Sequence, residues 1–338
     1  MAQSYILRNQ DDYLFFLGSK RPGPTWNQSC RITSDFRGFF AHGSLQAFAD
    51  ALQCEENGPE SLKEIVENYS RRPRSPHARI MGILNVTPDS FSDGGRFLSP
   101  DLAIEHGKRL IDEGADIIDI GGESSRPGAD PVDEEEELRR TQPVIEALVG
   151  LGNIEISIDT TKPGVARRSV EAGARWINDI SGFVKDEMIE VAARGSTGVV
   201  IMHRQGSSKT MQMAPYYDHL FSDVAEFLSA GATRVLHAGI PADRIYIDPG
   251  IGFGKTVEHN TLLISHIDFL LGLGFPICIG ASRKSFLKAV VPGEPQERLF
   301  PSVTAHTCAI LGGASLIRVH DVRPHREMVR TLELLNHA

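Results

Sequence analysis

The stretch MGILNVTPDSFSDGGRF, residues 81–97, changes character abruptly at Asn85. Before Asn85, an apolar run broken by one glycine predicts a buried strand. After it comes a loop rich in carboxylate and hydroxyl oxygens, closed by Gly94 and Gly95. Such a strand and loop are typical of the catalytic end of an α/β barrel, but Pro-Asp and Asp-Gly are also ordinary turn signals. Taken alone, this loop leaves both interpretations open.

The same change recurs along the rest of the chain. Strand-like apolar runs that end in polar residues occupy residues 80–84, 117–120, 154–158, 176–177, 198–202, 245–247, 276–279 and 316–319. Segments with helical spacing follow them, at residues 100–113, 133–148, 163–172, 186–193, 218–237, 261–271, 302–311 and 324–335. Eight such units in about 260 residues predict an α/β fold of the (β/α)₈ TIM-barrel type over residues 76–338. The alternative is a doubly wound open sheet, but the GxGxxG fingerprint that would favour it does not follow the first strand.

Residues 1–75 do not share this pattern, and we expect them to form an N-terminal extension of unknown role. Two short strands and two helices are predicted there, at residues 5–7, 13–17, 44–52 and 59–69. The sequence RRPRSP at residues 71–76 is typical of a linker. Because no chemical motif lies in this segment, a cap, an oligomerisation element and an accessory layer all stay open.

The composition is that of a globular protein and argues against several classes. Of the 338 residues, 41% are hydrophobic and 23% are charged. A net charge of −9 argues against general nucleic-acid or membrane-surface binding, so an anionic ligand needs its own cluster of Arg and Lys. Neither a membrane span nor a secretory apolar region is predicted. The cysteines Cys30, Cys54, Cys278 and Cys308 lack CxxC spacing, which fits a reducing cytoplasm better than a zinc ribbon or a disulfide scaffold.

Polar residues stand at the ends of all eight predicted barrel strands. They are Asn85, Asp119, Asp159, Asn178, His203, Asp248, Arg283 with Lys284, and Arg318 with His320. Any one of the Asn or Asp residues is most simply the cap of the following helix. A barrel, however, brings the carboxyl ends of its strands to one mouth. One shared pocket is therefore a better account of the whole set than eight separate caps.

The residues of this predicted pocket fall into two chemical groups. The acceptors and amides suit a flat heterocycle with amino and ring N–H groups; they are Asp159, Asn178 and Asp248. A second group, on the adjacent first and last strands, suits an anion such as a diphosphate; it consists of Asn85, Arg318 and His320. Lys284 is expected near both groups. Arg283 is expected to point outward in a structural ion pair, and His203 to be a satisfied polar residue.

Seven motifs along the barrel segment carry a family resemblance. They are LNVTPDSFSDGG (84–95), IDIGGESSRPGA (118–129), SIDTTKP (157–163), INDISG (177–182), DPGIGFGK (248–255), GASRKS (280–285) and RVHDV (318–322). Together they resemble the dihydropteroate synthase family, from about Arg79 to the C-terminus. The first two motifs in combination are highly specific, and the N-terminal 75 residues lie outside the resemblance.

The resemblance implies a pterin-binding barrel that makes 7,8-dihydropteroate and pyrophosphate from 6-hydroxymethyl-7,8-dihydropterin diphosphate and 4-aminobenzoate, in folate biosynthesis. It implies a pterin site of Asp159, Asn178, Asp248 and Lys284, and a diphosphate site of Asn85, Arg318 and His320. Mg²⁺ is the implied cofactor, with Asn85 as its ligand and Asp93 as a further candidate. The implied 4-aminobenzoate site consists of Phe91, Asp93, Ser125, Arg126, Pro127, Phe253 and Ser285. Catalytic roles are implied for Asp159, Lys284, Asp93 and Arg318, and sulfonamides are expected to compete with 4-aminobenzoate.

Two positions depart from the family pattern. Ser125 stands where the family usually has Thr, which keeps the hydroxyl but loses a methyl contact. Pro301 stands where the family usually has Gly, a change that the first turn of a helix tolerates. Two other functions stay open: a pterin-dependent corrinoid methyltransferase and a barrel that binds pterin without turnover. For Lys284, the alternative role is that of a lysine that forms a Schiff base with the substrate. The expected partners are small-molecule substrates, and the family tends to form homodimers.

Overall fold

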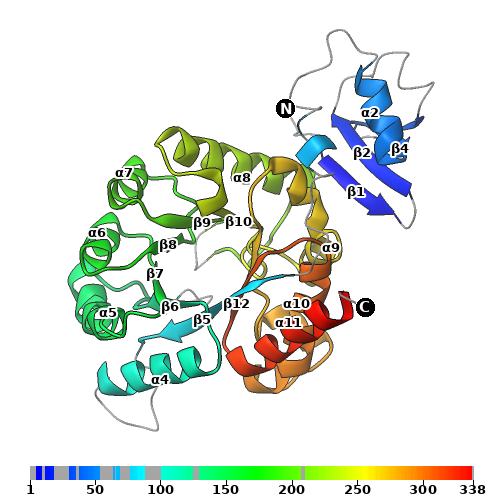
Figure 1. Cartoon of the computed structure of the whole chain (residues 1–338). Helices are drawn as coiled ribbons and strands as arrows, with labels where there is room; N and C mark the ends of the chain where they lie inside the picture. Colours follow the sequence, from blue (N-terminus) through cyan, green and yellow to red (C-terminus); the bar gives the residue numbers. More distant parts are fainter. Residues whose placement is uncertain are drawn as a thin grey trace.

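The computed structural model describes residues 5–9, 12–18, 30–35, 38–53, 64, 66–68, 77–87, 100–124, 129–206 and 210–336. Within them, eight parallel strands follow one another in the order β10-β9-β8-β7-β6-β5-β12-β11. Figure 1 labels β5 to β10 and β12 of this sheet, inside the surrounding helices. A parallel bridge between Ile247, in β10, and Ile277, just before β11, joins the two edges of this sheet. The ring confirms the predicted (β/α)₈ barrel, and its cyclic order excludes the doubly wound sheet.

The eight barrel strands are short and almost entirely buried. They are β5 (Arg79–Asn85), β6 (Ile117–Gly121), β7 (Glu155–Asp159), β8 (Trp176–Asp179), β9 (Gly198–Met202), β10 (Ile245–Asp248), β11 (Cys278–Ile279) and β12 (Leu316–Val319). The strand predicted at residues 276–279 is shorter than expected. Pro276 has no N–H to donate to the sheet, and only its carbonyl contributes, as acceptor from Ile247 N at 2.9 Å.

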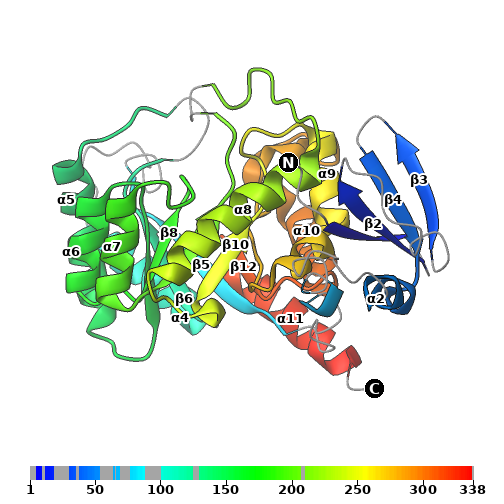
Figure 2. The same ribbon diagram turned by 90° about the horizontal axis from the view of Figure 1, so that it is seen from above.

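The helices form the outer layer of the barrel (Figure 2). They are α4 (Pro100–Asp112), α5 (Glu134–Val149), α6 (Pro163–Glu171), α7 (Asp186–Gly195), α8 (Leu220–His237), α9 (Val257–Ser265), α10 (Leu299–Leu311) and α11 (Val322–Asn336). Short 3₁₀ helices are η2 (Ala242–Arg244), η3 (Ile267–Leu273), η4 (Ser285–Ala289) and η5 (Pro295–Arg298). No helix in the part of the chain that the structure describes has the length and apolarity needed to cross a bilayer.

One predicted helix, at residues 261–271, has the wrong limits. The helix begins earlier, at Val257, because Thr256 caps it: its hydroxyl accepts from His259 N at 3.1 Å. It ends at Ser265, and the rest of the predicted span is the 3₁₀ helix η3. Helix α5 begins as expected, with Asp133 accepting from Glu136 N at 2.8 Å. Its four first-turn glutamates lie at the positive end of the helix dipole.

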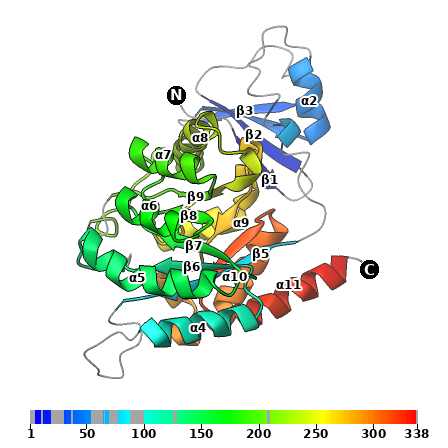
Figure 3. The same ribbon diagram turned by 60° about the vertical axis from the view of Figure 1, so that its left-hand side comes forward.

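The N-terminal segment forms a separate antiparallel sheet, ordered β1-β2-β4-β3. Its elements are β1 (Tyr5–Asn9), β2 (Asp12–Gly18), β3 (Arg31–Asp35), β4 (Gly38–Gly43) and the helix α2 (Leu45–Gln53). Strand β1 lies against η3 and α8, and Figure 3 shows the sheet beside α8. Ile6, Phe48 and Leu52 are buried in the same apolar core as the barrel helices.

This arrangement confirms the strands predicted at residues 5–7 and 13–17 and the helix at 44–52. Of the helix predicted at 59–69, only residues 64 and 66–68 are described, and they are helical. The linker at 71–76 lies outside the described residues. The division of the chain at residue 75 stays a prediction.

Candidate active site

An apolar layer fills the lower interior of the barrel. It consists of Met81, Ile117, Trp176, Val200, Tyr246, Cys278 and Leu316. The rings of Trp176 and Tyr246 meet edge to face, with centroids 5.5 Å apart. Since side chains alternate along a strand, the residue two positions further on points into the barrel one layer higher.

The next layer is polar on four of these strands. Two residues beyond the apolar layer stand Asp119, Asn178, Asp248 and Arg318. The strand register extends this layer sideways, because Asn85 pairs with Gly121, Gly121 with Asp159, and Asp159 with Asn178. The predicted convergence of polar strand ends is therefore present, and a packed floor lies beneath it.

Arg318 is the centre of this polar layer. Its Nε donates to Asp119 Oδ2 and its Nη2 donates to Asp159 Oδ2, both at 2.6 Å. Asn178 Nδ2 also donates to Asp119 Oδ2, at 3.0 Å. The other oxygen of Asp119 is buried and has no hydrogen-bond partner among the described residues. The guanidinium thus fixes two carboxylates from neighbouring strands and leaves one acceptor available.

Burial and neighbouring charges act in opposite directions on the pKa values of Asp159 and Asp248. Burial raises the pKa of Asp159 to about 7, Arg318 lowers it, and Asp119 raises it further. Burial also raises the pKa of Asp248, whose Oδ1 accepts from Gly250 N at 2.7 Å. Protonated and ionised forms of Asp159 are both accessible near neutral pH as a result.

Lys284 projects into the same space from the segment after β11. Its Nζ lies 4.0 Å from the ring centroid of Phe253, a cation–π contact. Gly252 has φ of +82°, and a Cβ there would lie 3.2 Å from Lys284 Cδ, so a glycine lets the lysine stem pass. Burial lowers the pKa of Lys284 to about 8, Arg318 acts in the same direction, and Asp248 and Asp159 oppose them.

A second buried lysine, Lys255, lies behind the site. Its Nζ is 2.9 Å from His203 Nδ1 and donates to the Phe253 carbonyl at 3.1 Å. Burial lowers the pKa of Lys255 to about 7, and burial followed by Lys255 lowers the pKa of His203. The prediction that His203 is a satisfied polar residue is confirmed.

The segments after β11 and β12 are tied together. Arg283 donates from Nε and Nη2 to both carboxylate oxygens of Asp321, at 2.9 and 2.5 Å, which confirms the predicted ion pair. His320 N donates to Ser282 Oγ at 3.1 Å, and its Nδ1 lies 3.0 Å from the same oxygen. These contacts tie the segment after β11, which carries Lys284, to the segment after β12, which carries His320.

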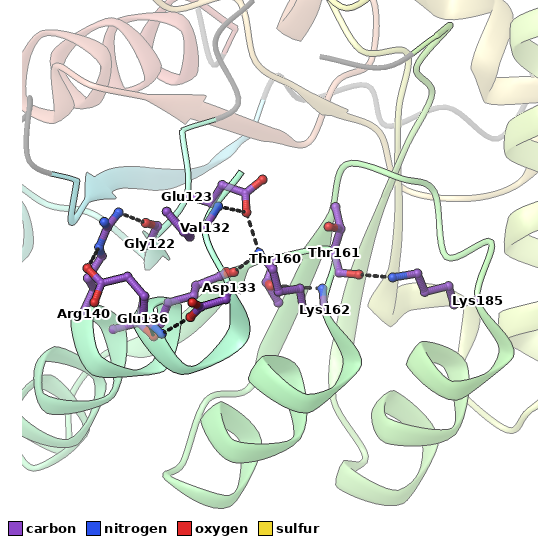
Figure 4. A network of polar contacts seen from close by, with 12 residues as sticks. Gly122, Glu123, Val132, Asp133, Glu136, Arg140, Thr160, Thr161, Lys162 and Lys185 are labelled. Atoms are coloured by element: carbon purple, nitrogen blue, oxygen red, sulfur yellow. Dashed lines mark hydrogen bonds and ion pairs between the residues drawn. The ribbon is translucent and has the colours of Figure 1, made fainter. Parts of the chain in front are cut away.

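The loop after β6 is held at both ends (Figure 4). Arg140 donates to the Gly122 carbonyl at 2.8 Å, and Glu123 accepts from Val132 N at 3.3 Å. Lys162, from the SIDTTKP segment, contacts the carboxylates of Glu123 and Glu137, both at 2.5 Å. Glu137 is fully buried, so Lys162 is its charge partner in a dry environment.

Replacing Lys162 with methionine should destabilise the protein by about 2 kcal/mol, because the buried carboxylate of Glu137 loses its cation. This loss is smaller than that for a fully buried ion pair because Lys162 is partly exposed. Urea unfolding at neutral pH measures the change. The matched control is Arg167→Met in α6, which removes an exposed ion pair with Glu187 of α7 and should cost less than about 1 kcal/mol. Equal losses for the two variants would contradict this assignment.

The structure brings together most of the sequence-predicted site. Asp159, Asn178, Asp248, Lys284, Arg318 and Asn85 share the mouth, with Phe253 under Lys284 and His320 at its edge. Ser285 is exposed at the start of η4. Five predicted residues lie outside the described residues: Phe91, Asp93, Ser125, Arg126 and Pro127.

The sequence assigned no chemical role to two residues of the site, Asp119 and Lys255, although Asp119 was among the polar strand ends predicted to share the pocket. Asp119 is fully buried between Ile118 and Ile120 in mid-strand. A buried carboxylate needs a charged or hydrogen-bonding partner, so an aspartate between two isoleucines of a strand could have indicated a site residue. The sequence contains no such indication for Lys255, because its burial depends on how the DPGIGFGK turn folds against β9.

Comparison with known proteins gives consistent matches over the barrel. The sequence model of the family described as "Pterin binding enzyme" matches residues 81–320. The dihydropteroate synthase of Escherichia coli strain K12 is 44% identical over 257 residues, which are 76% of this chain and 91% of that protein. The Yersinia pestis dihydropteroate synthase, solved with a sulfonamide drug, has a TM-score of 0.74 and 43% identity, over 78% of this chain and 95% of that chain. The Xanthomonas albilineans enzyme, solved with 4-aminobenzoic acid, has a TM-score of 0.73 and 43% identity, over 78% and 94%.

Proposed function

The chain belongs to the dihydropteroate synthase family of pterin-binding enzymes, and we propose that it condenses 6-hydroxymethyl-7,8-dihydropterin diphosphate with 4-aminobenzoate. The products are 7,8-dihydropteroate and pyrophosphate, so the enzyme is a transferase of folate biosynthesis. The observation that carries this proposal is the fork of Arg318 between Asp119 and Asp159 at a mouth lined by Asn178, Asp248 and Lys284. This mouth combines hydrogen-bond acceptors for the pterin ring with cationic side chains for the diphosphate.

The pterin is proposed to lie on the polar layer of the barrel. Its amino and ring N–H groups need acceptors, which Asp119, Asn178 and Asp248 supply, and its carbonyl needs a donor, which Lys284 supplies. Asp119 has an unpartnered buried oxygen in the described part of the site. A buried acceptor without a donor costs free energy that a bound pterin N–H would recover.

The diphosphate is proposed to lie towards Asn85, Arg318 and His320. A Cβ built on Gly121 would lie 3.6 Å from Asn85 Oδ1 and 3.8 Å from Asp159 Oδ2, so glycine leaves space beside two oxygens. Mg²⁺ prefers oxygen ligands, keeps several waters and takes others from phosphates. Asn85 therefore fits as the protein ligand of Mg²⁺, which when bound would stabilise charge on the diphosphate.

The proposed reaction begins with cleavage of the C–O bond to the diphosphate, whose oxygen keeps the electron pair. The cation that remains on the pterin lies close to Asp159, whose ionised carboxylate stabilises it in a site drier than water. Arg318 and His320 stabilise the departing diphosphate. The amine nitrogen of 4-aminobenzoate then forms the new C–N bond and releases a proton, and the amine needs orientation more than activation.

The 4-aminobenzoate site is proposed from Phe253 and Ser285 together with Phe91, Asp93, Ser125, Arg126 and Pro127. Phe253 is buried under Lys284, where its ring supports a neighbouring aromatic substrate. The known relative with bound 4-aminobenzoic acid supports this choice of substrate. Sulfonamides should compete there, and Ser125 supplies a hydroxyl without the methyl of the usual threonine.

The direct test is a coupled assay for pyrophosphate with both substrates and Mg²⁺, run with and without 4-aminobenzoate. Pyrophosphate release that depends on 4-aminobenzoate is the expected result. No release, with pterin still bound, would contradict the synthase and favour a barrel without turnover. Borohydride trapping of substrate on Lys284 would instead show a Schiff-base role for that lysine.

Assembly and compartment are proposed on separate grounds. Apolar side chains are exposed on α10 and α11, among them Phe300, Leu311 and Leu334. They support a homodimer that buries these helices, which sedimentation would test. Cys30, Cys278 and Cys308 are free thiols, in keeping with the proposed cytoplasmic location.

A further inference from the structure

Two buried histidines join the segments that follow β11 and β12. Ala281 N donates to His306 Nε2 at 3.1 Å, and His306 Nδ1 lies 3.0 Å from His325 Nε2. His325 Nδ1 in turn lies 2.6 Å from the Asp321 carbonyl oxygen. Both rings are completely buried, His306 on α10 and His325 on α11. The result is a continuous chain of hydrogen bonds from one loop to the other.

The donor at one end of this chain and the carbonyl acceptor at the other set a proton order within it, beside the backbone carbonyls of Ser302 and Ile279 that also face His306. A backbone N–H can only donate, so His306 Nε2 is an acceptor and its proton is on Nδ1. That Nδ1–H donates to His325 Nε2, which is therefore also an acceptor. The proton of His325 is then on Nδ1, where it donates to the carbonyl of Asp321. Both rings are neutral, and both carry their proton on Nδ1.

The segments that the histidines join carry the charged groups of the proposed diphosphate and pterin sites. Ala281 is three residues before Lys284, and Asp321 directly follows His320. The Asp321 carboxylate also holds Arg283, one residue before Lys284. The histidine chain thus acts beside the Arg283–Asp321 pair to hold the spacing between the two segments.

We propose that His306 and His325 are positioning residues for the pterin diphosphate, which hold the Lys284 segment in register with the Arg318 and His320 segment only while both rings are neutral. This inference rests on the proposed function. A proton added to either ring would place two N–H groups face to face, His306 against Ala281 or His325 against His306. The chain of hydrogen bonds would then break at that point.

Burial is the largest influence on the pKa of both rings and favours their neutral forms, while the backbone carbonyls of Ser302 and Ile279 oppose it. Burial lowers the pKa of both histidines, and His325 lowers that of His306 further. His320 acts on His306 in the same direction. Asp321, on the opposite side of His325, favours its charged form but does not overcome burial.

The hydrogen-bond order can be tested on the full-length protein by ¹⁵N NMR of the histidine rings. Two rings should show the Nδ1–H tautomer and keep it between about pH 8 and about pH 5, a range in which an ordinary exposed histidine gains a proton. The variants His306→Gln and His325→Gln assign the two signals, each by its loss. A proton on Nε2 of either ring, or titration together with the exposed histidines, would overturn the proposal.

Steady-state kinetics test the positioning role. His306→Leu and His325→Leu should each raise KM for the pterin diphosphate about tenfold, the scale of one buried hydrogen bond. KM for 4-aminobenzoate should change by less than about twofold. Since the two rings act as one unit, the double variant should be no worse than either single variant. His306→Gln should recover much of the loss, because its amide oxygen can accept from Ala281 N.

The matched control is Val329→Ala, which removes buried volume from α11 one turn beyond His325. It should lower the melting temperature and leave both KM values unchanged. If His306→Leu behaves like Val329→Ala, or raises both KM values equally, the pair is only structural and the proposal is wrong. Should the leucine variants fail to fold, His306→Gln and the wild-type tautomers still decide it. Failure of the proposed function would appear differently, as wild-type protein without pyrophosphate release.

Discussion

Asp159→Asn is expected to lower kcat by about a hundredfold or more, the scale of losing one key electrostatic group. Asparagine has the same shape and keeps an oxygen that can accept from Arg318 Nη2, now 2.6 Å from the aspartate. It lacks the negative charge that stabilises the pterin cation. Because Arg318 keeps its contact with Asp119, the site should stay assembled. The loss is therefore expected in kcat rather than in folding.

The pH dependence of the wild-type enzyme gives an independent check. Burial raises the pKa of Asp159 to about 7 from 3.8. If the ionised form is the active one, kcat should fall as the pH drops below about 7, and Asp159→Asn should lack this limb. The pH dependence of stability runs in the opposite direction to that of kcat. The folded state binds the proton of Asp159 more tightly than the unfolded state does. The contribution of Asp159 to stability is therefore lost as the pH rises from about 3.8 to about 7.

Asp116→Asn is a suitable control. Asp116 lies at the amino end of β6, away from the mouth, where it accepts from Ile80 N at 2.7 Å and pairs with Arg326. Its substitution should leave kcat within about twofold of wild type, since no reacting atom is near. An Asp159→Asn enzyme with wild-type kcat, alongside an unchanged Asp116→Asn enzyme, would remove Asp159 from the proposed mechanism.

The barrel and most of its mouth were predictable because strand ends must converge. Asn85, Asp159 and Asn178 occupy one register row, as their places after apolar runs indicated. Asp119 was predicted to share the pocket but was given no chemical role, because it stands among isoleucines, two residues before the observed end of β6. Only its parity with Asn178 and Arg318, each two residues beyond the apolar layer, shows that it faces inward.

The side-chain pairings were not predictable, because they join residues far apart in sequence. Nothing in RVHDV indicates that Arg318 will bind Asp119 and Asp159 rather than point only at an anion. The His306–His325 contact likewise depends on how α10 and α11 pack, and no motif contains either residue. The start of α9 at Val257 was not predicted because it depends on the hydrogen bond by which Thr256 caps the helix.

Arg318→Met is expected to have the largest effect on stability, a loss of about 3–5 kcal/mol. The guanidinium lies between two carboxylates, one of them fully buried, and methionine would leave both without a cation. Turnover should also be lost, because Arg318 bridges the acids and the leaving group in the proposed mechanism. Urea unfolding of the variant at neutral pH measures the stability change.

Two further measurements separate unpaired charge from lost packing. Adding Asp119→Asn to Arg318→Met should restore part of the stability, since one buried charge disappears, without restoring turnover. Lowering the pH towards about 5 should also narrow the gap to wild type, because unpaired buried carboxyls take up protons readily. The control Arg283→Met removes a more exposed pair with Asp321 and should cost about 1 kcal/mol. If Arg318→Met costs no more than Arg283→Met, or if Asp119→Asn deepens its loss, then the fork of Arg318 is not what holds the two carboxylates in the barrel.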